Sequence, residues 1–260
     1  MLQDLKSCQA RDRPEYPCPV AAKGITMAVL EGAPMIPLHD DNPTRITPIV
    51  TIALIGLCVM AFFWQLSLGP SQEAAMYALG VIPAVIFDKA QLAPQLAWVD
   101  PVLTPFTSMF LHGGFMHLGG NMLYLWIFGN NIEDAMGHGR FFIFYMVTGL
   151  GATMVHVLSD PNSTIPMIGA SGAIAGILGA YFVLYPKAKI KTFVVLIIFI
   201  QIIYVPAVFI LGFWFLRQII GIGSDDIAWY AHIGGFLVGM FLVRRFERPR
   251  RIIIDPRGEW

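Results

Sequence analysis

Long apolar stretches, separated by polar segments, dominate the pattern of hydrophobic and polar positions along the chain. A helix needs about twenty mainly apolar residues to cross a bilayer. Six stretches meet this requirement, at residues 48–68, 111–128, 141–158, 168–185, 193–216 and 227–243. Residues 69–110 hold two further apolar patches, 79–87 and 102–110, which are too short to span. The pattern predicts an all-α membrane protein, a bundle of six transmembrane helices with a long outer loop between helices 1 and 2.

Composition supports this class and argues against others. Hydrophobic residues make up 56% of the chain and charged residues 13%, whereas about a quarter of a typical soluble domain is charged. The balanced charge gives no sign of a nucleic-acid-binding surface, so we expect no nucleic-acid partner. Cys8, Cys18 and Cys58 are too few and too scattered for a disulfide framework or a zinc site. We therefore expect no cofactor and no metal.

Basic residues near the ends of the spans predict the orientation of the chain. They lie before the first stretch, between the second and third, between the fourth and fifth, and after the sixth: Arg45, Arg140, Lys187, Lys189, Lys191, Arg244, Arg245, Arg248, Arg250 and Arg251. The opposite side has only Lys89 and Arg217. Both termini are therefore predicted to be cytoplasmic.

The same pattern divides the chain into three parts. Residues 1–45 are expected to be a disordered cytoplasmic segment, with Met35 as an alternative start of translation. Residues 46–244 form the six-helix domain, and residues 245–260 form a basic cytoplasmic tail.

Strongly polar side chains lie in three of the predicted spans. His117 and Asn121 are in the second span, Ser171 is in the fourth and His232 is in the sixth. Placing strongly polar side chains in hydrocarbon costs free energy, so their presence in these spans indicates function. These three spans run in the same direction, and all four residues lie near the start of their span. We therefore expect the four side chains at one depth, close to the outer face.

Ser171 and His232 are candidates for a nucleophile and its base. An imidazole from another helix supplies the base that a neutral hydroxyl needs. No Asp or Glu occurs in the second, fourth or sixth span, and Asp225 and Asp226 come about two helical turns before His232. The sequence therefore favours a Ser-His dyad over a triad.

Small residues surround both candidates and would let their helices approach closely. They are Gly169, Gly172, Gly176, Gly235 and Gly239. Within each span these glycines form a stripe with a spacing of one helical turn, Gly172 and Gly176 in the fourth span and Gly235 and Gly239 in the sixth. Close packing of the two stripes would bring Ser171 within hydrogen-bonding reach of His232. Helix packing without chemistry is the alternative interpretation.

His117 and Asn121 lie one turn apart on the same helix face. Imidazole N–H and amide groups are suitable donors for the oxyanion that forms in acyl transfer, and a polar pair that only stabilises helix contacts is the alternative. A metal site formed by His112, His117 and His232 is a third idea, but no carboxylate or cysteine accompanies them.

Three motifs together resemble those of the rhomboid intramembrane serine proteases. They are HGGFMHLGGN at residues 112–121, GASG at 169–172 and AHIGG at 231–235, and the resemblance covers about residues 35–250. It implies a six-helix bundle with a water-filled cavity that opens outward. It further implies Ser171 as nucleophile, His232 as general base, and an oxyanion hole formed by His117, Asn121 and the Ser171 backbone N–H.

We expect a multi-pass protein of a bacterial plasma (inner) membrane, whose partners are the lipid bilayer and membrane-protein substrates. A transmembrane helix shields its carbonyl groups by its own hydrogen bonds, so we expect substrates with helix-destabilising transmembrane segments, cut at a small residue near the outer face. The resemblance implies that they enter between spans 2 and 5.

Two departures from the family pattern stand out. Ala175 occupies a position where some members have an aromatic residue that stacks on the catalytic imidazole, and residues 69–110 lack the arginine of some members. A catalytically inert rhomboid-like protein that binds or escorts membrane clients is the alternative function, although both Ser171 and His232 are present. A transporter is less favoured, because the sequence has no convincing internal repeat.

Overall fold

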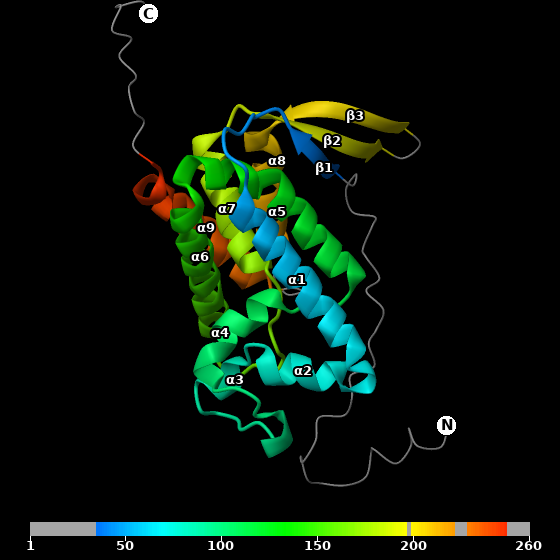
Figure 1. The fold of residues 1–260 in the computed structure, drawn as a ribbon, viewed down its shortest axis with the longest axis vertical. Coiled ribbons are helices and arrows are strands. Elements are labelled where there is room, and N and C mark those ends of the chain that lie inside the picture. The colour runs from blue at the N-terminus through cyan, green and yellow to red at the C-terminus, as the bar shows by residue number, and fades with distance from the viewer. Residues whose placement is uncertain (1–34, 197–198, 222–227, 249–260) are drawn as a thin grey trace, which may run out of the picture.

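The computed structural model describes residues 35–196, 199–221 and 228–248. Its principal helices are α1 (Ile49–Ser67), α5 (Phe115–Met136), α6 (His138–Ser159), α7 (Ser171–Leu184), α8 (Ala207–Ile220) and α9 (Trp229–Phe246). Figure 1 shows them as one bundle, and α7 contacts α5, α6, α8 and α9. Every residue of α7 from Ala173 to Tyr181 is buried, which makes α7 the central helix.

Each of the six predicted spans overlaps one of these helices. By length and composition, α1 and α6 are the described helices that are apolar enough to cross a membrane. Helices α7 and α8 are also apolar but have 14 residues each. The protein is therefore mostly helical, as predicted.

The prediction for residues 193–216 was wrong in its first half. Strands β2 (Lys189–Leu196) and β3 (Phe199–Pro206) form an antiparallel hairpin there, and α8 begins only at Ala207. In a long, continuously apolar run, hydrophobic periodicity does not distinguish a buried strand from a helix. The run is also rich in Val, Ile, Phe and Tyr, which favour strands.

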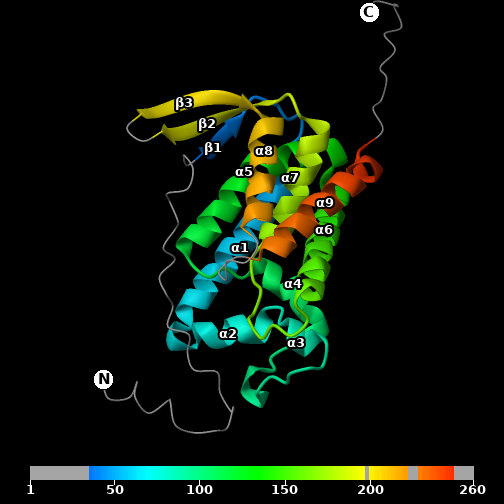
Figure 2. The same cartoon turned by 180° about the vertical axis from the view of Figure 1, so that it is seen from behind.

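A third strand, β1 (Met35–Asp40), pairs with β2 and completes a sheet of order β1-β2-β3. Figures 1 and 2 show this sheet at one end of the helix bundle. The expected disorder of residues 1–45 is therefore wrong for β1. Residues 1–34, and most of the predicted tail, lie outside the described residues.

Two aspartates attach β1 to the rest of the fold. The Tyr181 hydroxyl of α7 donates to Asp40 Oδ2 at 2.6 Å, and the backbone N–H of Lys189 donates to Asp41 Oδ1 at 2.7 Å. Burial raises the pKa of the Asp40 carboxyl above its ordinary value, and the Tyr181 hydrogen bond opposes this shift. The central helix is thus tied directly to the sheet.

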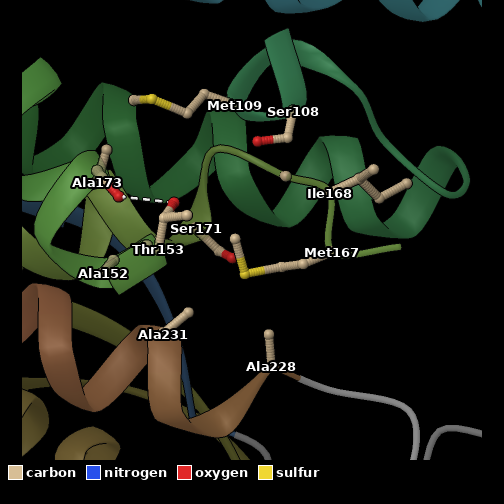
Figure 3. Close-up of a pocket in the computed structure, with 13 residues that line it drawn as sticks. Ser108, Met109, Ala152, Thr153, Met167, Ile168, Ser171, Ala173, Ala228 and Ala231 are labelled. Carbon is tan, nitrogen blue, oxygen red and sulfur yellow. Dashed lines mark hydrogen bonds between the residues drawn. The ribbon is translucent and has the colours of Figure 1, made fainter. Parts of the chain in front are cut away.

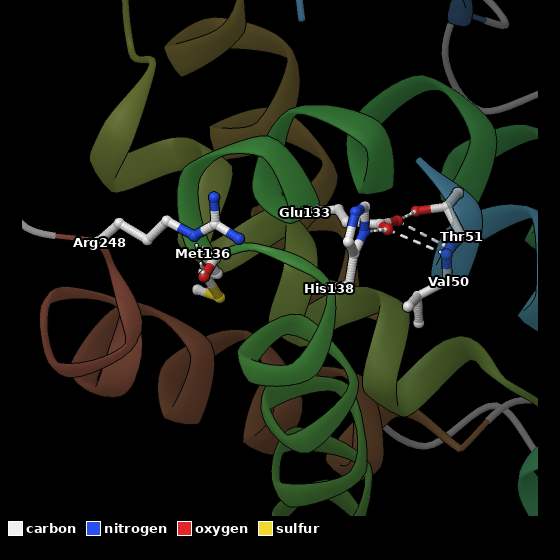
Figure 4. A network of polar contacts seen from close by, with 6 residues as sticks. All are labelled: Val50, Thr51, Glu133, Met136, His138 and Arg248. Atoms are coloured by element: carbon white, nitrogen blue, oxygen red, sulfur yellow. Dashed lines mark hydrogen bonds and ion pairs between the residues drawn. The ribbon is translucent and has the colours of Figure 1, made fainter. Parts of the chain in front are cut away.

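Glu133, near the end of α5, caps the start of α1 (Figure 4). Its carboxylate accepts hydrogen bonds from the backbone N–H groups of Val50 and Thr51, at 2.9 and 2.8 Å, and from the Thr51 hydroxyl at 2.7 Å. His138 Nδ1 lies 2.6 Å from the same carboxylate. The first N–H groups of a helix have no partner within it, so this fully buried glutamate satisfies them from another helix.

The segment between α1 and α5 forms short helices, including α2 (Gln72–Leu79), α3 (Pro83–Ile86) and α4 (Thr104–Thr107). They lie at the end of the bundle opposite the sheet (Figure 1). Val81 pairs with Met167 in an isolated β-bridge, and the Ala84 N–H donates to the Ser163 carbonyl at 2.9 Å. These backbone bonds attach the loop to the segment before α7 without an arginine.

Candidate active site

Ser171 is the first residue of α7, not a residue within the helix as the predicted span implied. Gly169, just before it, has a φ of +122°, which favours glycine. Its N–H donates to the Ser108 carbonyl at 2.9 Å. A Cβ at position 169 would also lie 2.8 Å from His117 Nε2 and 3.7 Å from Ser171 Oγ. Gly169 therefore leaves room for the His117 ring beside the serine hydroxyl.

Ser171 and His232 meet across the contact of α7 with α9. His232 Nε2 lies 2.8 Å from Ser171 Oγ. The predicted glycine stripes form this contact, because a Cβ at Gly235 or Gly239 would overlap the carbonyl oxygen of Gly172 or Gly176, respectively. The close approach of the two backbones is what brings the side chains within reach.

The other nitrogen of His232 has a partner on α8. Nδ1 lies 2.8 Å from Gln218 Oε1, and Gln218 Nε2 donates to the Trp214 carbonyl at 2.8 Å. The Trp214 ring lies 5.9 Å from the His232 ring, with an angle of 40° between their planes. Position 175 is an alanine, and the aromatic contacts to His232 come instead from Trp214 of α8 and from Trp229 of α9, whose ring centre lies 6.4 Å from that of the imidazole.

His117 and Asn121 lie at the start of α5, as expected for donors near the serine. The Gly113 N–H donates to His117 Nδ1 at 3.3 Å, so a neutral His117 carries its proton on Nε2, the nitrogen beside Gly169. Asn121 Nδ2 is buried and has no hydrogen-bond partner among the described residues. Among the described residues, these two N–H donors on one face of α5 have no acceptor, and the His117 nitrogen lies beside Gly169, two residues before Ser171.

The backbone provides further donors at the same place. Because Ser171 begins α7, its N–H and those of Gly172 and Ala173 have no acceptor within the helix. The positive end of the helix dipole also lies at Ser171 and favours a negative charge there. The side chains of α5 and the start of α7 thus form a surrounding suited to an oxyanion.

A small pocket adjoins Ser171 (Figure 3). Most of its lining residues are small: Ser108, Gly149, Ala152, Thr153, Gly169, Gly172, Ala173, Ala228 and Ala231. Met109, Met167 and Ile168 supply the larger side chains. Such a pocket has room for a small group beside the serine hydroxyl, and not for an aromatic ring.

The remaining candidates have other roles. His112 is fully buried, with Nδ1 3.2 Å from the Phe110 carbonyl, and Gln65 bonds both its backbone N–H and its carbonyl. Among the described residues, no group of three or more His, Cys, Asp or Glu is arranged to hold a metal ion. Asp225 and Asp226 lie outside the described residues.

Gln218 and Trp214 were not among the site residues predicted from the sequence. A polar side chain inside an apolar helix is the signal that could have revealed Gln218. The predicted span ended at residue 216, and this boundary left Gln218 in a loop. The error in the end of this span, which the structure places at Ile220, therefore concealed a partner of His232.

Known proteins resemble this chain over a large part of its length. The family model described as the Rhomboid domain matches residues 100–248. Over 184 residues the chain is 30% identical to Rhomboid protein 1, mitochondrial, of Saccharomyces cerevisiae, covering 64% of this chain and 49% of that protein. Over 210 residues it is 30% identical to Rhomboid protease GluP of Bacillus subtilis, covering 78% of this chain and 36% of that protein.

The chain is also similar to a plant protein. RHOMBOID-like protein 5 of Arabidopsis thaliana is 34% identical over 159 residues, which cover 58% of this chain and 46% of that protein. The matches span about half or less of the length of these relatives. The family model covers more than half of the chain, and the chain therefore belongs to the rhomboid family. Membership implies an integral membrane protein.

Proposed function

We propose that this protein is an intramembrane serine endopeptidase that cleaves transmembrane segments of membrane proteins near the outer face. The observation that carries the proposal is the 2.8 Å contact of Ser171 Oγ with His232 Nε2, in an imidazole whose Nδ1 is already bonded to Gln218. A hydroxyl becomes an effective nucleophile when an adjacent base can take its proton.

In the proposed reaction, Ser171 Oγ attacks the carbonyl carbon of the scissile peptide. The Oγ–C bond forms while the hydroxyl proton moves to His232 Nε2. Collapse of the tetrahedral intermediate breaks the C–N bond, and the same proton passes to the departing nitrogen. Water then attacks the acyl carbon while His232 Nε2 takes one of its protons, and the C–Oγ bond breaks as that proton passes to Oγ, which regenerates Ser171.

The oxyanion of the intermediate would be held by His117, Asn121 and the Ser171 backbone N–H. Support comes from two donors: His117 Nδ1 accepts from the Gly113 N–H, which leaves Nε2 as the donor, and Asn121 Nδ2 has no hydrogen-bond partner among the described residues. Donors that are already fixed before the reaction stabilise charge without reorganisation. A site used only for helix packing would be expected to pair these groups internally.

Substrates of this site would be single-span membrane proteins whose transmembrane helix is easily unwound. A helix shields its carbonyl groups by its own hydrogen bonds, so local unwinding must precede attack. The pocket beside Ser171, lined mostly by Gly, Ala, Ser and Thr, supports cleavage at a small residue. The entry route, between α5 and α8, follows from the family resemblance.

The proposed topology has six membrane-spanning helices, α1 and α5 to α9, with both termini in the cytoplasm of a bacterial cell. The basic residues that favour it lie at the sheet end of the bundle, as Arg45 and Lys189 do. The site lies at the other end, where α5, α7 and α9 begin. The active site would therefore open toward the outer face of the plasma membrane.

The alternative is a catalytically inert rhomboid-like protein that binds membrane clients. The paired hydroxyl and imidazole favour the protease, because client binding does not need them. Treatment of the purified protein in detergent with a serine-directed mechanism-based inhibitor, followed by mass mapping, separates the two. The protease should be labelled at Ser171, and a folded protein that stays unlabelled there would support the inert alternative.

A further inference from the structure

Both nitrogens of the His232 imidazole are engaged, and the two partners differ in what they can donate. Gln218 Nε2 donates to the Trp214 carbonyl, so the amide oxygen of Gln218 must be the atom that faces His232. An amide oxygen only accepts hydrogen bonds. His232 Nδ1 must therefore carry the proton, which leaves Nε2 free to accept the proton of Ser171 Oγ.

Helix α8 also restrains the plane of the ring. Trp214, one turn before Gln218, lies against the His232 ring on one side and stacks on Phe236 of α9, with ring centres 6.0 Å apart and planes at 30°. Gln218 is 6% exposed, so water competes little for its amide. The hydrogen bond and the aromatic contact from α8 thus restrain the orientation of the ring, together with the Trp229 ring of α9, which lies 6.4 Å away with its plane at 85° to the imidazole.

We propose that Gln218 is a positioning residue for the general base, and that its neutral amide orients the imidazole as the carboxylate does in a Ser-His-Asp triad. The inference rests on the proposed protease function. When Nε2 takes the serine proton, Nδ1–H stays bonded to Gln218 Oε1, so the ring keeps its orientation until the proton reaches the leaving nitrogen. The amide fixes the tautomer but adds no negative charge to stabilise the imidazolium.

Two substitutions separate positioning from packing. Gln218→Met keeps the length and most of the volume of the side chain but removes the acceptor. Gln218→Glu keeps an acceptor and adds a charge. Ile220→Ala is the matched control on the same helix, because Ile220 is 70% exposed and on the outside of the bundle.

The measurement is kcat, KM and the pH profile of cleavage of one membrane substrate by the full chain in detergent. Gln218→Met should lower kcat by roughly 10- to 100-fold, a part of the 10²- to 10⁴-fold that a general base contributes, with little change in KM. Gln218→Glu should retain most of the activity at high pH. The acidic limb of its profile should move to higher pH, because a carboxylate stabilises the protonated imidazole.

The pH readout must allow for other charges near the ring. Among the described residues, His117 of α5 and His156 of α6 are the titratable groups whose charge acts on His232. They are unchanged in all four proteins, so a shift confined to Gln218→Glu reports the new carboxylate. Ile220→Ala should match the wild type in rate and profile.

Wild-type activity of Gln218→Met would overturn the positioning role, and so would equal losses in the Met and Glu variants with an unmoved profile. Neither result would affect the proposed function, since the wild type would still cleave its substrate. Absence of cleavage and of inhibitor labelling at Ser171 in the wild type would instead overturn the proposed function itself.

Discussion

Gly235 of α9 packs directly on the backbone of Gly172 in α7, so closely that a Cβ at position 235 would overlap the Gly172 carbonyl oxygen. One turn further on, Gly239 has the same relationship to Gly176. The contact lies next to the residues that meet in the site, Ser171 and His232. The separation of α7 from α9 therefore sets the distance between hydroxyl and imidazole.

The first prediction tests this contact. Gly239→Ala should lower the unfolding temperature and the rate of cleavage, because overpacking a close contact costs about 1–3 kcal/mol and pushes the helices apart. Gly56→Ala in α1 is the control, since a Cβ there meets nothing within 4 Å. The control should be neutral or slightly stabilised. Equal behaviour of both variants in thermal unfolding would contradict the role of the glycine contact.

The second prediction concerns the proposed dyad. Ser171→Ala and His232→Ala should each reduce turnover by roughly 10⁴-fold or more while the bundle stays folded, because each removes chemistry and little buried apolar volume. Proteolysis and thermal unfolding should be measured on the same samples. Substantial turnover by folded Ser171→Ala would exclude this dyad, and unfolding of both variants would support a structural role.

The third prediction concerns the proposed oxyanion hole. Asn121→Ala should lower kcat by roughly 10²- to 10³-fold with substrate binding retained, the usual cost of losing one donor. His117→Ala should behave similarly. Asn130→Ala, toward the other end of α5, should keep normal kinetics. If Asn121→Ala raised only KM, Asn121 would be a contact to the bound substrate and not to the oxyanion.

The fourth prediction concerns the choice of substrate. Gly and Pro weaken a helix by about 1 and 3 kcal/mol relative to Ala, so transmembrane segments containing them near the outer face should be cleaved fastest. The test is a series of substrates in which these residues are replaced by Leu and Ala while the residues at the scissile bond are kept. Equal cleavage of the strongly helical version would refute the need for unwinding.

The fifth prediction concerns the sheet end of the bundle. Because the pKa of Asp40 is raised in the folded protein, the native state holds this proton to a higher pH than the unfolded chain does. The protonated Asp40 carboxyl therefore adds to the free energy of unfolding fully below the pKa of the unfolded chain, about 3.8. This contribution is lost as the pH rises through the pKa of Asp40 in the folded protein. Asp40→Asn, always neutral, should lack this loss.

Thermal unfolding in detergent at several pH values between about 4 and 7 measures this effect. The unfolding temperature of Asp40→Asn relative to the wild type should increase as the pH rises. Asp88→Asn, at an exposed position in the loop between α1 and α5, is the control for the substitution itself. An unfolding-temperature difference between Asp40→Asn and the wild type that does not change with pH would contradict the raised pKa of Asp40.

Sequence alone determined the class of the protein, the positions of most helices and the pairing of Ser171 with His232. Helix positions follow from local composition, because about twenty apolar residues in a row are a strong signal. His117, Asn121, Ser171 and His232 were recognisable because polar groups are rare in apolar helices. The stripes at Gly172 and Gly235 predicted the contact of α7 with α9 for the same local reason.

Tertiary structure decided what depends on partners far apart in the chain. The run at 193–206 became a hairpin that pairs with Met35–Asp40, a choice that local periodicity does not encode. The same choice moved α8 toward the C-terminus and placed Gln218 against His232. A hydrogen bond between helices depends on their relative rotation and depth, which packing alone sets, and so the partner of the proposed base became visible only in the folded protein.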